Sequence, residues 1–236
     1  MSTVLKWIEP SWPAPPGIRA LCTTRSGGVS TGPFAGLNLA DHVGDEPSLV
    51  VRNRALLCAR LDLPAEPHWL RQVHGRRVVD ASRDSRDCRA DAVIATGPGE
   101  VCAVLTADCL PLLLCDAAGT RVAVVHAGWR GLAKGIIEAA IARLAVPPRE
   151  VLCWLGPAIG PQAFEVGAEV RAHFLAQGSE DTKAAFVPVP GGKWLANLYA
   201  LARERLHACG SDRVWGGGLC TYSDPERFGS GKFLNG

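Results

Sequence analysis

The sequence has no long apolar segment and carries little net charge. No stretch approaches the ~20 apolar residues that a membrane helix needs, and Met1 to Glu9 lacks the basic start and apolar core of a signal peptide. The formal net charge is +2, and the arginines are scattered rather than clustered into a basic surface. We therefore expect a protein that binds neither membranes nor nucleic acids.

Several common catalytic motifs are also missing. The sequence has no HExxH zinc motif, no Walker loop, no GxGxxG and no zinc-deaminase signature. Residues 28–32 match the pattern G-x-S-x-G, but a nucleophile elbow must lead directly into a helix, and Pro33-Phe34-Ala35-Gly36 follows here. We reject Ser30 as a hydrolase nucleophile.

The nine cysteines do not suggest a disulfide framework. Their number is odd, the chain is long and no export signal precedes them, so reduced thiols in the cytoplasm are the simpler reading. Buried cysteines usually behave as small apolar residues. A functional cysteine must therefore be argued from its neighbours.

Length and patterning predict one domain over residues 1–236. Apolar residues make up 47% of the chain, and no linker, repeat or low-complexity segment divides it. Hairpins alternate with strand–helix units, which indicates an α/β or α+β fold with a mixed sheet. The expected strands are Ile18–Thr24, Trp69–Val73, Arg77–Ala81, Ala92–Thr96, Val101–Thr106, Leu112–Cys115, Arg121–Val125, Val151–Leu155 and Arg213–Trp215. The first expected helix is capped by Asp45, has Pro47 in its first turn and ends near Leu61. The other expected helices are Gly131–Ala145, Val166–Gln177 and Trp194–Cys209.

Three potential metal ligands fall at the ends of expected strands. His126 ends an apolar strand and leads into a helix, Cys109 lies in a polar break between two apolar strands, and His74 lies beside a glycine. Strands of one sheet can bring their ends together, and a strand end that leads into a helix is a common site location. His173 and His207 fall inside expected helices, where we interpret them as solvated side chains.

Two imidazoles and a thiolate are a suitable donor set for zinc. With three protein ligands and an open fourth position, His74, Cys109 and His126 fit the catalytic rather than the closed structural type of zinc site. Copper also accepts imidazole and thiolate, so the donor types alone do not choose the ion.

The chain resembles the YfiH/LACC1 family of laccase-like proteins. The most specific matches are Ala107-Asp108-Cys109-Leu110-Pro111 and His126-Ala127-Gly128-Trp129-Arg130-Gly131. Further matches are residues 24–30 (TRSGGVS), 37–39 (LNL), 72–75 (QVHG), 156–160 (GPAIG), Val166-Gly167 and Cys220-Thr221.

This resemblance implies a single α/β domain, a mixed β-sandwich flanked by helices, with a metal site on His74, Cys109 and His126 that is usually assigned zinc. It also implies a purine nucleoside phosphorylase, with adenosine deaminase and methylthioadenosine phosphorylase activities attributed to the family. The partners would then be a purine nucleoside and phosphate. The chain differs from the family pattern at Asn197, where an aspartate is usual, and after Thr221, where a tyrosine and an arginine pair are missing.

Three residues are candidates for substrate binding. Arg25 in its Gly-rich loop and Arg130 at a helix start could hold phosphate, because a guanidinium fork matches phosphate oxygens. Asn38 lies in the second matching motif, Leu37-Asn38-Leu39.

Three other functions compete with the phosphorylase. A copper-dependent polyphenol oxidase normally needs many histidines, and this chain has six and no His-x-His pair. A Cys109–His126 amide hydrolase would fit the peptidoglycan editing that has been attributed to some family members. A non-enzymatic protein with a structural zinc would need a fourth protein ligand, for which no motif is evident.

Overall fold

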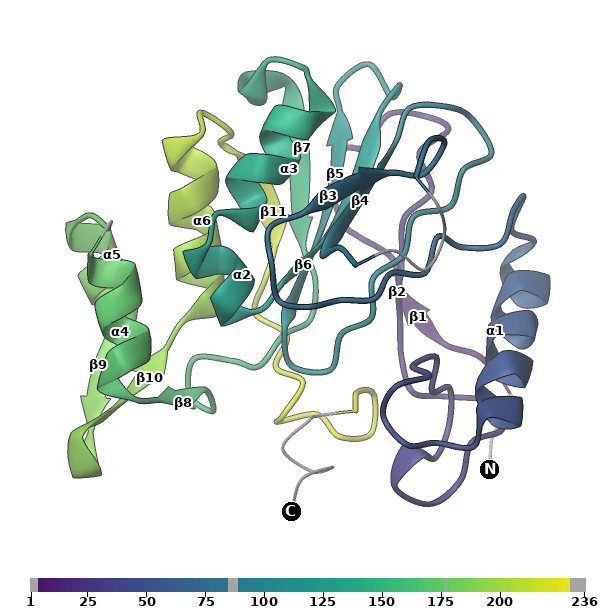
Figure 1. The fold of residues 1–236 in the computed structure, drawn as a ribbon, viewed down its shortest axis with the longest axis horizontal. Helices are drawn as coiled ribbons and strands as arrows, with labels where there is room; N and C mark the ends of the chain where they lie inside the picture. The colour runs from purple at the N-terminus through teal and green to yellow at the C-terminus, as the bar shows by residue number, and fades with distance from the viewer. Residues whose placement is uncertain (1–3, 85–88, 177, 230–236) are drawn as a thin grey trace.

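A computed structural model describes residues 4–84, 89–176 and 178–229 (Figure 1). The strands are β1 (Trp7–Ile8), β2 (Cys22–Thr23), β3 (Val78–Asp80), β4 (Ala92–Ala95), β5 (Leu110–Asp116), β6 (Val122–Ala127), β7 (Val151–Leu155), β8 (Glu165–Val166), β9 (Phe186–Val189), β10 (Lys193–Ala196) and β11 (Arg213–Gly216). The α-helices are α1 (Pro47–Leu61), α2 (Trp129–Ala133), α3 (Ile136–Leu144), α4 (Ala168–Leu175), α5 (Glu180–Ala184) and α6 (Leu198–Ala208). Short 3-10 helices cover Gly32–Phe34, Pro148–Glu150 and Pro190–Gly192.

A six-stranded mixed sheet forms the centre of the fold, with strand order β11-β7-β5-β6-β4-β3. Strand β5 runs antiparallel to both of its neighbours, and the two outer pairs, β11–β7 and β3–β4, are parallel. Every residue of β4, β5 and β7 is buried, which explains why these segments are apolar rather than alternating. The chain is thus the single-domain α/β protein with a mixed sheet that the resemblance implied.

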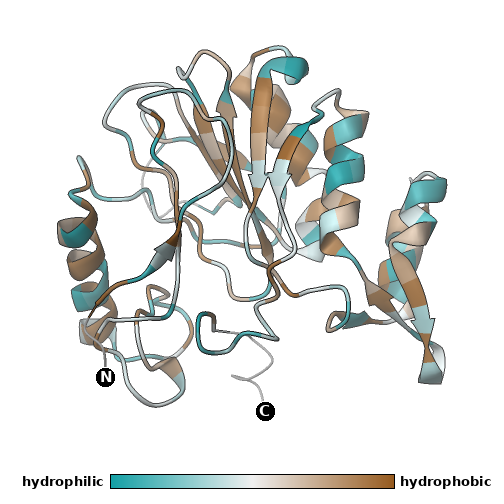
Figure 2. Cartoon of the chain, turned by 180° about the vertical axis from the view of Figure 1, so that it is seen from behind, coloured by the Kyte–Doolittle hydropathy of each residue, from teal (hydrophilic) through white to brown (hydrophobic). Residues whose placement is uncertain are grey.

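Helices α2, α3 and α6 lie against one face of this sheet (Figure 1). Apolar residues of α3 and α6 form one large core with the strands of the sheet, whose hydrophobic residues appear brown in the centre of Figure 2. Ile136, Ile137 and Leu144 of α3 are fully buried there. The sheet therefore has a rigid apolar support directly behind β6, the strand that carries His126.

Two smaller parts adjoin the sheet. The three-stranded sheet β8-β10-β9 lies with α4 and α5 at the lower left of Figure 1. Helix α1, at the opposite side, packs its Leu57 and Leu61 with Leu5, Leu37 and Leu39 in a separate core.

The expected elements agree best in the middle of the chain. The strand Val151–Leu155 has the predicted bounds, and the first expected helix contains Pro47 in its first turn and ends at Leu61 as predicted. Residues 116–120 form the turn between the antiparallel strands β5 and β6. Strands Trp69–Val73 and Val101–Thr106 were wrong, because these segments make only isolated bridges, His68 to Cys102 and Arg71 to Arg89. The strand expected over Ile18–Thr24 shortens to β2.

Three helix predictions need correction. The helix expected over Gly131–Ala145 is broken at Gly135, whose φ of +86° ends one helix and starts the next. Trp194–Cys209 is helical only from Leu198, because its first residues pair as β10 with β8 and β9. The helix expected from Val166 begins at Ala168, and Gln177 lies outside the described residues.

The predicted cap of α1 was also wrong. Glu46 is the N-cap residue and makes no side-chain cap, whereas the Asp45 carboxylate accepts hydrogen bonds from Ser30 and Asn38. Among the described residues, no helix is long and apolar enough to cross a membrane.

Candidate metal centre

The structure brings His74, Cys109 and His126 together. One potential ligand atom from each lies within 4.8 Å of the other two. The Cys109 Sγ is 3.7 Å from Nε2 of His74, and the two imidazole rings meet edge to face with centroids 4.7 Å apart. Ligands on a tetrahedral zinc, with bonds of about 2.0–2.3 Å, lie about 3.3–3.8 Å apart, so small side-chain movements would complete such a site.

A β-hairpin places two of the three residues. Cys109 directly precedes β5, and His126 is the next-to-last residue of β6. Strands β5 and β6 are antiparallel, with Pro111 opposite His126 and Leu110 opposite Ala127. The start of one strand therefore lies beside the end of the other, which brings Cys109 next to His126.

His74 reaches the centre from a turn and not from a strand. Its φ of +54° is a left-handed conformation that few residues other than glycine and asparagine adopt without strain. The carboxylate of Asp91 accepts hydrogen bonds from the backbone N–H groups of this turn and also from Nδ1 of His126. Sequence reasoning missed Asp91, which stands in the sequence only as an acidic residue directly before the apolar strand Ala92–Ala95.

Gly128 is the small residue that allows the close packing of this centre. A Cβ atom at this position would lie 2.7 Å from the Cys109 sulfur and 2.9 Å from Cδ2 of His74. The backbone of Gly128 is in an ordinary extended conformation, so space, not φ, requires glycine. This explains the glycine of the His126–Gly131 motif.

Two other motif segments are hydrogen-bonded to Asp108, the residue before Cys109. The backbone N–H of Ile159 donates to the Asp108 carbonyl at 2.9 Å, and the Thr221 hydroxyl donates to the Asp108 carboxylate at 2.7 Å. The N–H of Thr221 donates in turn to the Ala158 carbonyl at 3.0 Å. The segments 156–160 and 220–221 therefore act as a scaffold for the turn that ends at Cys109.

Burial has opposite consequences for metal binding at Cys109 and His74. Burial, reinforced by the charges of Asp108 and Asp91, raises the pKa of the Cys109 thiol to about 11. Burial and the neighbouring His126 lower the pKa of His74, which keeps its imidazole neutral and able to ligate. A thiol in this setting becomes a thiolate near neutral pH only when a strong positive charge lies beside it.

The three predicted substrate residues have different surroundings. Arg130 is exposed on α2, its guanidinium stacks 4.5 Å from the Trp129 ring, and its charge acts on both His74 and Cys109. The guanidinium of Arg25 donates to the carbonyls of Ala35 and Pro225. Asn38 donates to the Asp45 carboxylate, within a network around the fully buried Asn53.

The other described histidines lie outside this cluster. His173 and His207 are exposed on α4 and α6, and His207 is paired with Asp212. Asn197, one of the departures from the family pattern, caps α6 by accepting a hydrogen bond from the Ala200 N–H at 3.1 Å. The tail from Ser230 onward and Cys88 lie outside the described residues.

Comparison with known proteins shows the family to which the chain belongs. A family model described as multi-copper polyphenol oxidoreductase laccase matches residues 19–232. The chain belongs to this family.

Its relatives carry a different functional name. A Pseudomonas aeruginosa protein named purine nucleoside phosphorylase is 55% identical over 94% of this chain and 90% of its own length. The Escherichia coli purine nucleoside phosphorylase YfiH is 50% identical over 94% of this chain and 91% of its own length.

Solved structures show the same fold. The Neisseria meningitidis protein NMB0706 superimposes with a TM-score of 0.91 at 45% identity, covering 95% of this chain and 92% of that one. YlmD from Geobacillus stearothermophilus gives a TM-score of 0.88 at 29% identity, covering 98% and 92%.

Proposed function

We propose that this protein is a purine nucleoside phosphorylase, which transfers the ribosyl group of a purine nucleoside to phosphate. The observation that carries the proposal is the clustering of His74, Cys109 and His126 in a chain 50% and 55% identical to two relatives with that name. Adenosine, inosine and guanosine are the proposed nucleosides. Deamination of adenosine and phosphorolysis of methylthioadenosine are proposed as accompanying activities.

His74, Cys109 and His126 would hold a zinc ion and leave its fourth position open. Bound there, zinc would supply Lewis acidity close to the reacting nucleoside. The exposed guanidinium of Arg130, next to two of the proposed ligands, is the first candidate to bind phosphate, because its fork can hold two phosphate oxygens. Arg25 and Asn38 stay predictions as substrate-binding residues.

A copper polyphenol oxidase is the alternative that the family description favours. Multicopper chemistry needs ligands for several copper ions, whereas the chain has six histidines and no His-x-His pair. Among the residues that the structure describes, His74, Cys109 and His126 form the one cluster of three or more potential ligands. Copper in this site remains an alternative ion, and we propose zinc.

The two remaining alternatives receive less support. A Cys109–His126 amide hydrolase would use Cys109 as its nucleophile, and burial raises the pKa of that thiol to about 11. A structural zinc would normally have a fourth protein ligand, and the cluster offers three. We place the reaction in the cytoplasm, where these thiols would stay reduced.

The test is to incubate the purified protein with adenosine or inosine and phosphate, and to measure free base and ribose-1-phosphate by chromatography. Base release should require phosphate and disappear in Cys109→Ala and His126→Ala. Cys58→Ala, on helix α1, and His173→Ala, exposed on α4, serve as controls for the residue types and should stay active.

Metal dependence is tested in the same assay. Chelator treatment should remove the activity, and zinc should restore it better than copper. Inactivity of the zinc-loaded protein on all three nucleosides would exclude the phosphorylase, and phenol oxidation and amide cleavage would be measured next.

A further inference from the structure

Asp91 is a completely buried acidic residue in the short link before β4. Its side-chain exposure is 0%, and its ion-pair partner among the residues that the structure describes is His126, not a lysine or arginine. A buried carboxylate is costly unless hydrogen bonds satisfy it. The groups that satisfy Asp91 all belong to the segments that carry His74 and His126.

The first group of donors is the turn that presents His74. Three consecutive backbone N–H groups point at the carboxylate: Val73 and His74 donate to Oδ1 at 3.2 and 2.8 Å, and Gly75 donates to Oδ2 at 2.7 Å. These bonds compensate for the left-handed backbone of His74. Asp91 thereby fixes the conformation of the turn and, with it, the direction of the His74 ring.

The second donor is His126 itself. Its Nδ1 lies 2.9 Å from Oδ1 of Asp91, and its backbone N–H donates to the Asp91 carbonyl at 2.7 Å. An ionised carboxylate only accepts hydrogen bonds, so Nδ1 must carry the proton. The lone pair of the neutral ring is then on Nε2, the other ring nitrogen, and is free to bind a metal.

We propose that Asp91 is the positioning residue of this centre: one buried carboxylate fixes both histidine ligands, so that they are assembled before the metal binds. The inference rests on the metal role proposed for His74, Cys109 and His126. It adds that the two histidines are held jointly, because the same oxygen, Oδ1, accepts from His74 and from His126.

Asparagine has the shape of aspartate but cannot replace it here. Its amide must turn an NH₂ group toward either the Gly75 N–H or the pair formed by the His74 N–H and His126 Nδ1. In the first orientation two donors face each other in the His74 turn. In the second orientation they face each other at both histidines, unless His126 changes its tautomer. Either orientation misplaces at least one ligand.

The test compares Asp91→Asn with Asp116→Asn. Asp116 is a matched control because it is 4% exposed, lies in the same sheet and accepts hydrogen bonds from the Thr120 and Arg121 backbone N–H groups. It lies at the other end of β5 from Cys109. Both variants should lose stability, whereas only Asp91→Asn should lose metal affinity.

Zinc affinity is measured by competition with a chelator, and the visible absorption of the cobalt-substituted protein reports the ligand geometry. We expect Asp91→Asn to bind zinc about 10–100-fold more weakly than the wild type, with altered cobalt bands. Equal affinities and spectra in Asp91→Asn and wild type would overturn the role of Asp91. If the wild type itself binds neither ion, the proposed metal centre fails instead.

A second measurement needs no variant. In the metal-free wild type, ¹⁵N NMR of the histidine rings should show His126 as the Nδ1–H tautomer. An Nε2–H tautomer would overturn the proposal, even if Asp91→Asn could not be purified folded.

Discussion

The sulfur of Cys109 lies 3.7 Å from Nε2 of His74, although 35 residues separate them in the chain. Nothing local joins the two residues. They meet because β5 begins directly after Cys109 and because the His74 turn is hydrogen-bonded to Asp91, the residue before β4. Strand β4 pairs with β6, which lies next to β5. The order of the strands therefore brings the proposed ligands together. Substitutions that disturb the contact between Cys109 and the His74 turn should abolish metal binding.

Gly128→Ala is expected to disrupt the centre while the protein stays folded. The added methyl would lie 2.7 Å from the Cys109 sulfur, so the sulfur or the His74 ring must move. Overpacking of this kind costs about 1–3 kcal/mol, and strain of this size on the ligands would lower the zinc affinity about 5–150-fold. Calorimetric titration with zinc measures the loss.

Gly97→Ala is the matched control for this substitution. Its nearest neighbour would be the Glu100 side chain at 3.7 Å, an ordinary contact. Wild-type affinity in Gly128→Ala would show that the site opens more easily than the structure indicates.

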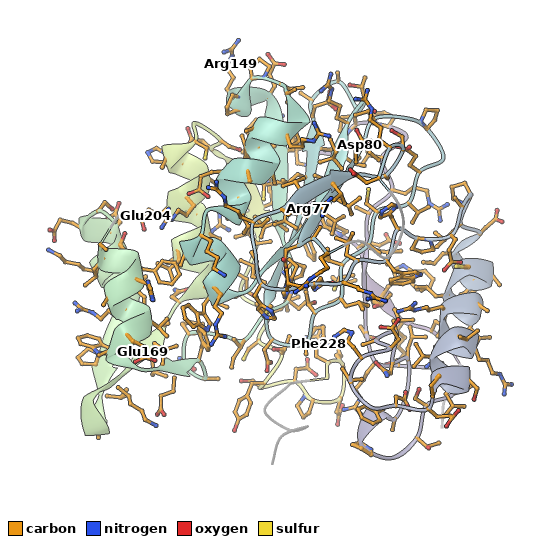
Figure 3. The ribbon with its side chains drawn as sticks, in the orientation of Figure 1. Arg77, Asp80, Arg149, Glu169, Glu204 and Phe228 are labelled. Atoms are coloured by element: carbon orange, nitrogen blue, oxygen red, sulfur yellow. The ribbon has the colours of Figure 1, made fainter. Side chains whose placement is uncertain are left out.

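Arg130→Ala should weaken phosphate binding. Loss of hydrogen bonds to a charged group costs about 1.5–3 kcal/mol, so the KM for phosphate should rise about 10–100-fold, while the KM for the nucleoside changes less. Initial-rate kinetics at varied phosphate measure the effect. Arg149→Ala, on an exposed side chain that projects from the top of the molecule in Figure 3, should leave both constants unchanged. An unchanged phosphate KM in Arg130→Ala would assign phosphate binding to another residue.

Tyr199→Phe should destabilise the fold. The buried Tyr199 hydroxyl accepts from the Ala158 N–H at 2.9 Å and lies within hydrogen-bonding distance of the Gly156 and Leu219 carbonyls. Leaving such buried groups without this partner costs about 1–3 kcal/mol. Urea unfolding measures the change in the free energy of unfolding. Tyr222→Phe, at a position 39% exposed, should change it far less, and equal values for the two variants would contradict this role.

Alkaline pH should reduce stability through the buried thiols. Burial raises the pKa of Cys115 to about 11, and it also raises the pKa of the fully buried Cys153. Between pH 9 and about 11 the folded state then binds more protons than the unfolded state, so the free energy of unfolding falls as the pH rises. Urea unfolding between pH 8 and about 10.5 should show this slope, and Cys115→Ala should flatten it.

The Cys220 thiol should affect the pH dependence of stability in the opposite direction, because its pKa is lowered. Burial acts to raise the pKa of its thiol, but hydrogen bonds from Ser223 and from the Gly160 backbone outweigh this and hold the pKa below its usual value. Cys220→Ala should therefore remove a stabilising contribution that grows as the pH rises toward 9. Between pH 8 and 9 the free energy of unfolding of this variant should fall more steeply with pH than that of the wild type, and a flatter curve in this range would contradict the assignment.

The strands that could be predicted from the sequence are the fully buried strands of the central sheet. The segments around Val93, Leu113 and Trp154 are almost entirely apolar, because every residue of these three strands is buried. Trp194–Ala196 could not be read in this way, since its strand character comes from pairing with residues 186–189 and 165–166. The break at Gly135 was visible as a glycine, but the apolar pattern continued across it.

Some residues of the candidate site could likewise be predicted from the sequence and others could not. His74, Cys109 and His126 could be named because their types and their positions at strand ends point to a metal. Asp91 could not be named, because its significance depends on hydrogen bonds to a turn 16–18 residues away. Arg25 and Asn38 were selected as polar residues in matching motifs, whereas their carbonyl and carboxylate partners depend on how the 25–38 loop folds.

The turn that sets the pairing register of β5 and β6 lies far from the proposed metal ligands on this hairpin. Its turn at residues 116–120 lies at the opposite end of the strands from Cys109 and His126, about 20 Å away at ~3.3 Å per residue. Insertion of one residue into this turn could shift the pairing by one position and rotate His126 to the other face of the sheet. The length of a loop that touches neither metal nor substrate would then decide whether the enzyme works, so natural variation in loop length should be tolerated elsewhere on the surface before it is tolerated here.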